Sequence, residues 1–402
     1  MWSSRLLPIR TYALGSWVAR PSSHNEPGSP AASLSRRRLR DTAQSTQPSP
    51  PATRTYMHSS TALVAVAVAA TALLLLQRQR GLLPLHHRPL RPFGACVEAS
   101  LPSLIRNGAL LRRLWRQNGG LLVLRGLSLT PRGMLELSAL FGEVEQELDD
   151  SKIHFRVGGL SSVMRIGNVR DETGRLISMH TISAPLPPGG SAQYRAAERQ
   201  PAWHTDSLYR RRPPVGSALY CVTAPPSGGA TCFADATTAF ASLDEVTKER
   251  LRGLTCVCSM AHHDAKVKKR GSPDYPTLSE AQRRANPAQR VPLVLRHPQT
   301  GREALSGMNA GTCAVLPGGA ELSRAEMDRC ELEAVEMPSV EAELRALLPF
   351  ATRDEFVVQW QWEPGDFVVW DNRCTMHCAT GFEWQRFTRE MWRTTLVREW
   401  EE

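Results

Sequence analysis

The stretch FVVQWQWEPGDFVVWDNRCTMH, residues 356–377, decides the fold. Residues 356–362 and 367–370 are short runs rich in β-branched and aromatic residues, and the Glu-Pro-Gly-Asp segment between them has the composition of a turn. Similar short runs occur at residues 121–124, 163–169, 215–222 and 291–295, while helical spacing appears at 101–115, 130–140, 236–253 and 339–348. Many short strands with few helices predict a mainly β fold with peripheral helices, a sandwich or jelly roll.

The net charge of +10 comes from one end of the chain. Residues 1–95 contain twelve arginines, no lysine and two acidic residues, so the remaining residues balance to zero. A nucleic-acid-binding protein would carry its basic excess on the folded part. The charge distribution therefore excludes nucleic acid as a partner.

Residues 1–56 are rich in Arg, Ser, Pro and Ala, the composition of a disordered targeting segment. We expect them to direct the chain to an organelle, a mitochondrion in preference to a chloroplast. Residues 57–95 contain the uncharged run 61–76, which is marginal for a bilayer span of roughly 20 residues. A single membrane anchor and a cleaved targeting element are both open for this run, and residues 82–92 are predicted to form a linker.

Residues 96–402 show strand and helix patterns throughout, which predicts one large domain. Nine cysteines without a repeated Cys-x-x-Cys pair fit free thiols in a reducing compartment. The composition is compatible with a homo-oligomer.

One pattern in this domain points to metal chemistry. In Trp203-His204-Thr205-Asp206, an imidazole and a carboxylate two residues apart lie on the same side of an extended segment. A third ligand must come from elsewhere, and His377, which follows the strand at 367–370, is the natural candidate. Two histidines and one carboxylate form the site of non-haem Fe(II) oxygenases.

Other histidines have simpler interpretations. His262 and His263 would point to opposite faces of a strand and would not share one ion. His297 lies in a His-Pro-Gln-Thr-Gly turn, for which we expect a surface role.

Around these residues the sequence resembles the taurine/2,4-D dioxygenase family (TauD/TfdA) of Fe(II)- and 2-oxoglutarate-dependent oxygenases. The resemblance spans roughly residues 97–400 and rests on ordered segments: 203–206, Arg-Pro-Pro at 212–214, Gly-Gly-Ala-Thr at 228–231, 292–301, Trp-Glu-Pro-Gly-Asp at 362–366, 370–377 and Arg-Glu-Met-Trp-Arg at 389–393. It implies a double-stranded β-helix, a cupin-like jelly roll.

The resemblance also implies roles for individual residues. His204, Asp206 and His377 would be the iron ligands and form the catalytic centre. Thr231 and Arg389 would bind the distal carboxylate of 2-oxoglutarate, which suits a guanidinium because its planar fork makes two parallel hydrogen bonds. Arg393, four residues further along the same strand face, and Gln200 would contact the substrate. The implied cofactors are Fe(2+), 2-oxoglutarate and O₂, with ascorbate as a reductant.

The implied reaction is the hydroxylation or desaturation of a small organic anion, such as a sulfonate or carboxylate, with release of succinate and CO₂. Two alternatives remain open. One is a quaternary-amine hydroxylase of the carnitine-synthesis type, in which aromatic residues supply cation–π contacts: Trp203, Tyr209, Trp384 and Trp392. The other is a non-catalytic membrane-tethered scaffold, whose expected mark would be a lost metal ligand.

Overall fold

The computed structural model describes residues 85–146, 155–178, 203–269 and 278–400. The predicted targeting segment 1–56 and the apolar run 61–76 lie outside these residues. Within the described ranges, no helix combines the length and apolarity needed to cross a membrane. Strand β1 (His87–Pro89) pairs with β2 (Ala95–Glu98), so the linker predicted at 82–92 is partly wrong. The prolines that suggested a linker are tolerated because β1 is an edge strand.

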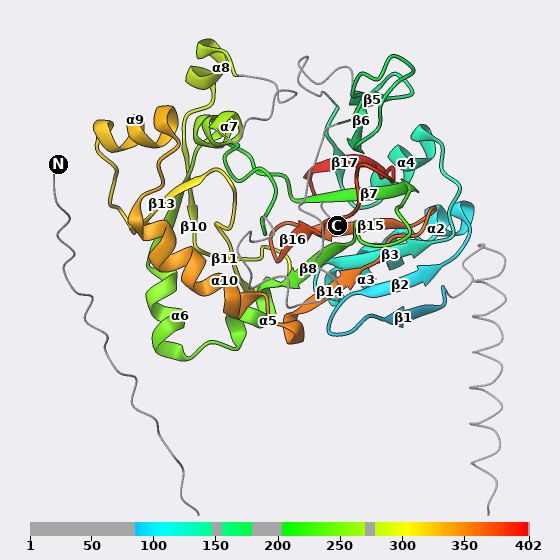
Figure 1. Cartoon of the computed structure of the whole chain (residues 1–402). Coiled ribbons are helices and arrows are strands. Elements are labelled where there is room, and N and C mark those ends of the chain that lie inside the picture. Colours follow the sequence, from blue (N-terminus) through cyan, green and yellow to red (C-terminus); the bar gives the residue numbers. More distant parts are fainter. Residues whose placement is uncertain (1–84, 147–154, 179–202, 270–277, 401–402) are drawn as a thin grey trace, which may run out of the picture. The chain divides into compact units, whose positions relative to one another are not determined.

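The largest sheet has nine strands in the described part of the chain (Figure 1). Neighbouring strands are antiparallel except β2 and β3, which are parallel. The order is β1, β2, β3 (Leu121–Arg125), β15 (Phe367–Asp371), β7 (Gly216–Thr223), β17 (Glu390–Arg398), β6 (Leu160–Gly167) and β5 (Arg156–Val157), with β4 (Glu143–Val144) pairing β17.

A second, three-stranded sheet faces the large one. Its order is β14 (Val357–Trp360), β8 (Thr231–Asp235) and β16 (Thr375–Ala379). Leu121, Val123 and Val368 of the large sheet share one buried core with Phe233 and Val358 of the small sheet. Two antiparallel sheets packed across an apolar core confirm the prediction of a mainly β jelly roll with peripheral helices.

Helices cover the other face of the large sheet. Leu122 and Leu124, which alternate with the inward residues of β3, pack there against α2 (Leu101–Arg106), α3 (Gly108–Gln117) and α4 (Pro131–Ser138). The helix predicted at 101–115 is interrupted at Asn107, which ends α2 and begins α3. Thr130 caps α4 as expected, since its side chain accepts from the Gly133 N–H at 3.1 Å.

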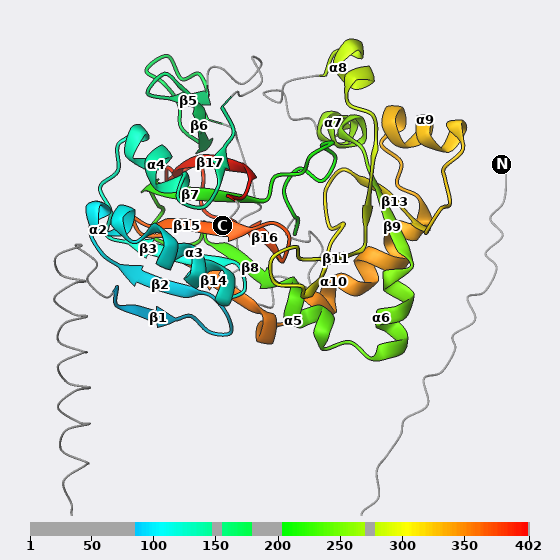
Figure 2. The ribbon, with the colours of Figure 1, turned by 180° about the vertical axis from the view of Figure 1, so that it is seen from behind.

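A long insertion between β8 and β14 forms the layer visible beside the two sheets in Figures 1 and 2. The helix predicted at 236–253 is two helices, because Asp244 caps a second one. The insertion contains α5 (Ala236–Ala241), α6 (Glu245–Arg252), β9 (Leu254–Cys258), α7 (Met260–Lys269), α8 (Glu280–Ala285), β10 (Gln289–Pro292), β11 (Val294–Arg296), β12 (Glu303–Leu305), β13 (Thr312–Pro317), α9 (Arg324–Glu333), the π-helix η3 (Val340–Arg345), α10 (Ala346–Ala351) and the 3₁₀ turn η4 (Asp354–Phe356).

Candidate functional site

His204 and His377 are neighbours although they are far apart in sequence. His377 lies in the middle of β16, and His204 pairs with it through two backbone hydrogen bonds of 2.9 Å, one in each direction. Their imidazole rings are 4.2 Å apart, centroid to centroid. The small sheet therefore brings the two predicted histidines together.

Asp206 completes the group. Its Oδ1 lies 3.7 Å from Nε2 of His204 and 3.7 Å from Nε2 of His377, and the three ligand atoms all lie within 4.8 Å of one another. Two ligands about 2.1 Å from one metal ion are roughly 3.0 to 4.2 Å apart, and both distances from Asp206 Oδ1 to the histidine nitrogens lie in this range. The arrangement and the donor set, two imidazole nitrogens and one carboxylate oxygen, fit a single divalent iron.

The backbone that carries His204 and Asp206 is held on both sides of the motif. The Thr205 N–H donates to the Met308 carbonyl at 2.7 Å, and Asn309 Nδ2 donates to the Thr205 carbonyl at 2.6 Å. Ser207 then turns the chain with a left-handed backbone, φ 49°. The extended conformation assumed for this segment is therefore fixed by the insertion.

The second carboxylate oxygen of Asp206 is turned away from the histidines. Its Oδ2 accepts from Ser217 Oγ at 2.8 Å and lies 2.9 Å from Nη2 of Arg393, which also donates to Ser217 Oγ at 3.2 Å. Burial raises the pKa of the Asp206 carboxyl, but the Arg393 charge, the two nearby imidazoles and the Ser217 hydrogen bond together outweigh burial, so the pKa lies below its usual range. Asp206 is therefore an anion with one free oxygen facing the histidines.

His377 is neutral in this setting. Burial, reinforced by the nearby charges of His204 and Arg393 and opposed by Asp206, lowers the pKa of His377 to about 3. Its ring packs against Trp370 at 4.7 Å, centroid to centroid. The His204 side chain is 32% exposed while that of His377 is 9% exposed, so the cluster is accessible from the His204 side.

Thr231 lies near His377 on the facing strand. Phe233 is directly opposite His377 in the pairing of β8 with β16, and Thr231 is two residues earlier, on the same face. The buried Thr231 Oγ1 accepts from Trp362 Nε1 at 2.9 Å. Because the tryptophan occupies an acceptor position, the hydroxyl proton of Thr231 remains available for donation.

Arg389 is buried beside the same strand. Its Nε donates to the Gly229 carbonyl at 2.9 Å, two residues before Thr231. None of the described carboxylates forms a salt bridge with Arg389, and burial lowers the pKa of its guanidinium to about 10. A buried cation without an acidic partner among the described residues fits an anionic ligand.

Two residues predicted to bind substrate have different outcomes. Arg393 lies at the centre but contacts Asp206 and Ser217, and its buried Nε makes no hydrogen bond to the described residues. Gln200 lies outside the described residues. Ser217 was not predicted, although a serine within the apolar run of β7 is a recognisable signal.

A second group, His297, Asp371 and Cys374, also has ligand atoms within 4.8 Å of one another. The predicted surface role of His297 is wrong, because the residue is only 3% exposed. Its Nδ1 accepts from the backbone N–H groups of Gln299 and Thr300, so its Nε2 carries the proton and donates to Asp371 Oδ2 at 3.0 Å.

This second group forms a hydrogen-bond network with the residues around it. Both oxygens of Asp371 also accept from Arg373, whose guanidinium forms an ion pair with Glu399 at 2.7 Å. Burial and the neighbouring acids raise the pKa of the Cys374 thiol well above its usual value, so the thiol is protonated in this network. The network fixes the turn between β15 and β16, just before His377.

The histidine pair in the insertion also differs from expectation. His262 and His263 lie on helix α7 and not on a strand. His262 is fully buried and its Nδ1 is 2.7 Å from the Cys330 carbonyl, while the ring of His263 stacks on Tyr209 at 5.7 Å. The two rings still have separate surroundings, so they share no ion.

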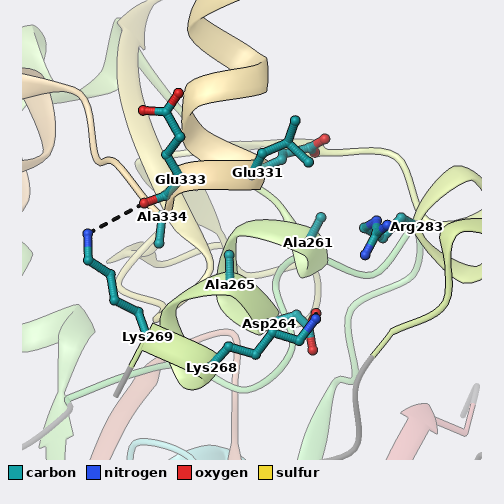
Figure 3. Close-up of a pocket in the computed structure, with 10 residues that line it drawn as sticks. Ala261, Asp264, Ala265, Lys268, Lys269, Arg283, Glu331, Glu333 and Ala334 are labelled. Atoms are coloured by element: carbon teal, nitrogen blue, oxygen red, sulfur yellow. Dashed lines mark hydrogen bonds and ion pairs between the residues drawn. The ribbon is translucent and has the colours of Figure 1, made fainter. Parts of the chain in front are cut away.

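Figure 3 shows a cavity of about 300 Å³ between α7, α8 and α9. It lies in the insertion and contains none of the predicted site residues. Lys268 pairs with Asp264 at 3.1 Å, and Lys269 donates to the Glu333 carbonyl at 3.5 Å. These charged groups are already partnered within the chain, so we assign the cavity no role.

Comparison with known proteins agrees with this geometry. The family model "Taurine catabolism dioxygenase TauD, TfdA family" matches residues 86–395. An (S)-phenoxypropionate/alpha-ketoglutarate-dioxygenase from Delftia acidovorans is 29% identical over 72% of this chain and 86% of its own length. An alpha-ketoglutarate-dependent sulfate ester dioxygenase from Pseudomonas putida is 32% identical over 45% of this chain and 55% of its own length.

Among solved structures, a taurine dioxygenase from Burkholderia xenovorans superposes with a TM-score of 0.54 at 26% identity, over 78% of this chain and 91% of that one. The family model covers most of the chain and includes every residue of the His–Asp–His cluster. The chain therefore belongs to the TauD/TfdA family of Fe(II)- and 2-oxoglutarate-dependent dioxygenases, and it is an oxidoreductase.

Proposed function

We propose that the chain hydroxylates a small organic anion and that His204, Asp206 and His377 hold its iron. The convergence of these three side chains on one point is the observation that carries the proposal. Bound iron and 2-oxoglutarate supply the oxidising chemistry: O₂ converts the 2-oxo acid to succinate and CO₂, and one oxygen atom is inserted into a C–H bond of the substrate. The protein residues bind, orient and exclude water.

The surroundings of His377 and Asp206 give each side chain a lone pair that can bind a metal ion. The neutral imidazole of His377 can donate a lone pair without losing a proton first. Asp206 offers Oδ1 alone, because Ser217 and Arg393 occupy Oδ2. Three protein ligands on one side leave the remaining coordination positions for the 2-oxo acid and O₂.

Arg389 and Thr231 would bind the distal carboxylate of 2-oxoglutarate. The guanidinium of Arg389 is buried, and its Nε is fixed by Gly229, which leaves the terminal nitrogens to form two parallel hydrogen bonds. Thr231 would add its hydroxyl proton, which Trp362 leaves free. Arg389 directly precedes strand β17 and Thr231 begins strand β8, and Arg389 contacts Gly229, two residues before Thr231.

An anionic substrate is supported by the charge at the centre. The buried Nε of Arg393, beside Asp206, has no hydrogen-bond partner in the part of the chain that the structure describes, and this N–H can donate to an anion. The relatives named above act on a phenoxypropionate, a sulfate ester and taurine, so carboxylates, sulfate esters and sulfonates form the substrate class we propose. Arg393 disfavours the quaternary-amine alternative, because a cationic substrate would face a fixed positive charge.

The test measures succinate formed from 2-oxoglutarate by the full chain with Fe(II) and ascorbate, across small carboxylates, sulfate esters, sulfonates and trimethylammonium compounds. We expect turnover with one of the anion classes and its loss in His204→Ala. His87→Ala, on the exposed strand β1, is the matched control and should retain activity. Iron binding without succinate formation on any anion, or full activity of His204→Ala, would refute the proposal.

We also propose that residues 1–56 direct the chain to an organelle, preferentially a mitochondrion, and that residues 61–76 anchor it to a membrane. The Arg-rich, acid-poor composition of the first segment and the sixteen uncharged residues of the second support this proposal. Fractionation of cells followed by carbonate extraction tests it. Release of the chain into the soluble fraction excludes the anchor, and recovery outside organelles excludes targeting.

A further inference from the structure

Both polar atoms of the Asn168 side chain form hydrogen bonds to one short segment, residues 384–389. Asn168 follows strand β6, and its Oδ1 accepts the backbone N–H of Arg389 at 2.8 Å. Its Nδ2 donates to the carbonyls of Trp384 and Phe387, both at 2.9 Å. Its own backbone N–H donates to the Arg389 carbonyl at 3.2 Å. The segment that leads into β17 is therefore clamped by a single residue.

Only an asparagine satisfies this set of contacts. Aspartate has no donor for the two carbonyls, and serine or alanine cannot reach all three partners. The preceding residue, Gly167, has φ 143°, and a Cβ there would lie 1.8 Å from the Arg389 carbonyl oxygen. The close approach of β6 to Arg389 thus depends on a Gly-Asn pair.

The clamp determines where the guanidinium of Arg389 lies. Asn168 fixes the backbone of Arg389 through both its N–H and its carbonyl, and Gly229 fixes Nε. Because the backbone and Nε of Arg389 are both held by hydrogen bonds, its terminal nitrogens have little conformational freedom. Such preorganisation lowers the entropy lost when an anion binds.

We propose that Asn168 is a positioning residue that sets Arg389 for the distal carboxylate of 2-oxoglutarate. This inference rests on the proposed function of Arg389 and goes beyond it, because Asn168 itself touches neither the metal ligands nor the ligand. A residue that served only to support the fold would affect all 2-oxo acids alike. A residue that acts through Arg389 affects only those with a distal carboxylate.

The experiment titrates the Fe(II)-loaded full chain with 2-oxoglutarate without O₂, following the visible absorption that appears when a 2-oxo acid chelates Fe(II). 2-Oxobutyrate, which lacks the distal carboxylate, is the second probe. In Asn168→Asp we expect 2-oxoglutarate affinity to fall roughly 10- to 100-fold, since several hydrogen bonds are lost and a carboxylate is placed near Arg389. The affinity for 2-oxobutyrate should stay unchanged.

A double variant separates positioning from general support. In the Arg389→Ala background, Asn168→Asp should weaken 2-oxoglutarate binding no further, because the residue through which it acts is gone. Asn107→Ala is the matched control: this buried asparagine donates to the Ser103 carbonyl between α2 and α3, so 2-oxoglutarate affinity should not change.

Three outcomes would overturn the inference: equal loss for both 2-oxo acids, additive effects in the double variant, or unchanged affinity in Asn168→Asp. If Arg389→Ala alone leaves 2-oxoglutarate affinity unchanged, the proposed role of Arg389 fails as well, and the two failures are thereby distinguished. Should Asn168→Asp not fold, Asn168→Ser, which keeps an acceptor oxygen and adds no charge, is titrated with the same expectations and a smaller effect.

Discussion

Arg393 and Asp206 form an ion pair at the His–Asp–His cluster, with Nη2 2.9 Å from Oδ2. The pair gives the two oxygens of one carboxylate different tasks, because Oδ2 is bound to protein while Oδ1 faces both histidines. An arginine expected to hold substrate therefore also orients a proposed metal ligand.

Replacing Arg393 by methionine should weaken substrate binding but strengthen iron binding. The variant leaves a buried carboxylate with Ser217 as its remaining fixed partner, and removing one member of a buried pair costs about 3–5 kcal/mol. Since a bound Fe(II) ion would compensate that carboxylate, the cost falls on the metal-free protein, and the Fe(II) Kd should fall about tenfold. Calorimetric titration with Fe(II) under argon measures it.

Arg398→Met is the control for this variant. Arg398 lies on the same strand β17 but pairs with Glu143 at the surface, where its side chain is 70% exposed. Exposed pairs contribute about 0–1 kcal/mol, so iron affinity should stay at the wild-type value. An Arg393→Met protein with unchanged iron affinity would show that Arg393 serves the substrate alone.

Trp362→Phe should raise the KM for 2-oxoglutarate about 3- to 10-fold with a smaller change in kcat. The variant removes the N–H that orients the Thr231 hydroxyl but keeps an aromatic ring in the core, and one neutral hydrogen bond contributes about 0.5–1.5 kcal/mol. Steady-state kinetics with varied 2-oxoglutarate provide the measurement.

Trp400→Phe is the matched substitution, because Trp400 Nε1 donates to the Ala139 carbonyl at the surface, 2.6 Å away. It should leave the KM for 2-oxoglutarate unaltered. Equal KM values for Trp362→Phe and the wild type would mean that the hydroxyl of Thr231 needs no orientation.

Asp371 should make stability depend on pH in the acidic range. Burial raises the pKa of this carboxyl, but Arg373 and His297 outweigh burial and lower it to about 2. Since the folded pKa lies below the ordinary value of 3.8, the stabilisation is present above pH 4 and is lost as the pH falls towards 2. The full difference corresponds to about 2 kcal/mol.

Urea unfolding of Asp371→Asn and the wild type at pH 7, 5, 4 and 3 tests this dependence. The variant should be less stable at pH 7, and its free energy of unfolding should fall less between pH 5 and pH 3. Asp328→Asn removes a carboxylate that pairs with Arg324 on the exposed side of α9, and it should keep the wild-type slope. Parallel slopes for Asp371→Asn and the wild type would contradict the role of the buried network.

Metal removal should lower the thermal stability of the protein. A ligand that binds only the folded state adds about 4 kcal/mol at a thousandfold excess over its Kd. We expect chelation to decrease Tm and Fe(II) to restore it, with no restoration in His377→Ala. Scanning calorimetry of both proteins checks this. If neither the chelator nor Fe(II) changes the Tm of the wild type, a resident metal is excluded.

The sequence predicts those features that arise from local patterns. Polar and apolar residues do not alternate in the strand at 367–370, because helices cover one of its faces and the small sheet covers the other. Its continuous apolar run therefore predicts a buried strand from the sequence alone. In an extended segment, side chains two residues apart point to the same side. His204 and Asp206 could therefore be identified as candidate metal ligands from their spacing.

Features that depend on distant partners could not be read from the sequence. His297 lies in a surface-type turn, yet its acceptor is Asp371, 74 residues later, and no local pattern reports that contact. Asn168 is likewise an ordinary residue at a strand end until the segment that contains Arg389 is placed beside it. The sequence predicted that Arg393 lies at the site, but it could not predict the ion pair with Asp206, which lies on another segment.

The outermost strand of the large sheet has a consequence for solubility. All three residues of β1, His87, Arg88 and Pro89, are exposed, and they cover β2, whose first three residues are buried. A charged, proline-containing edge cannot template the addition of another chain, whereas a bare apolar edge can. A chain shortened to begin at residue 96 would lose β1 and should self-associate. A chain that begins at residue 85 would keep β1 and should stay monodisperse.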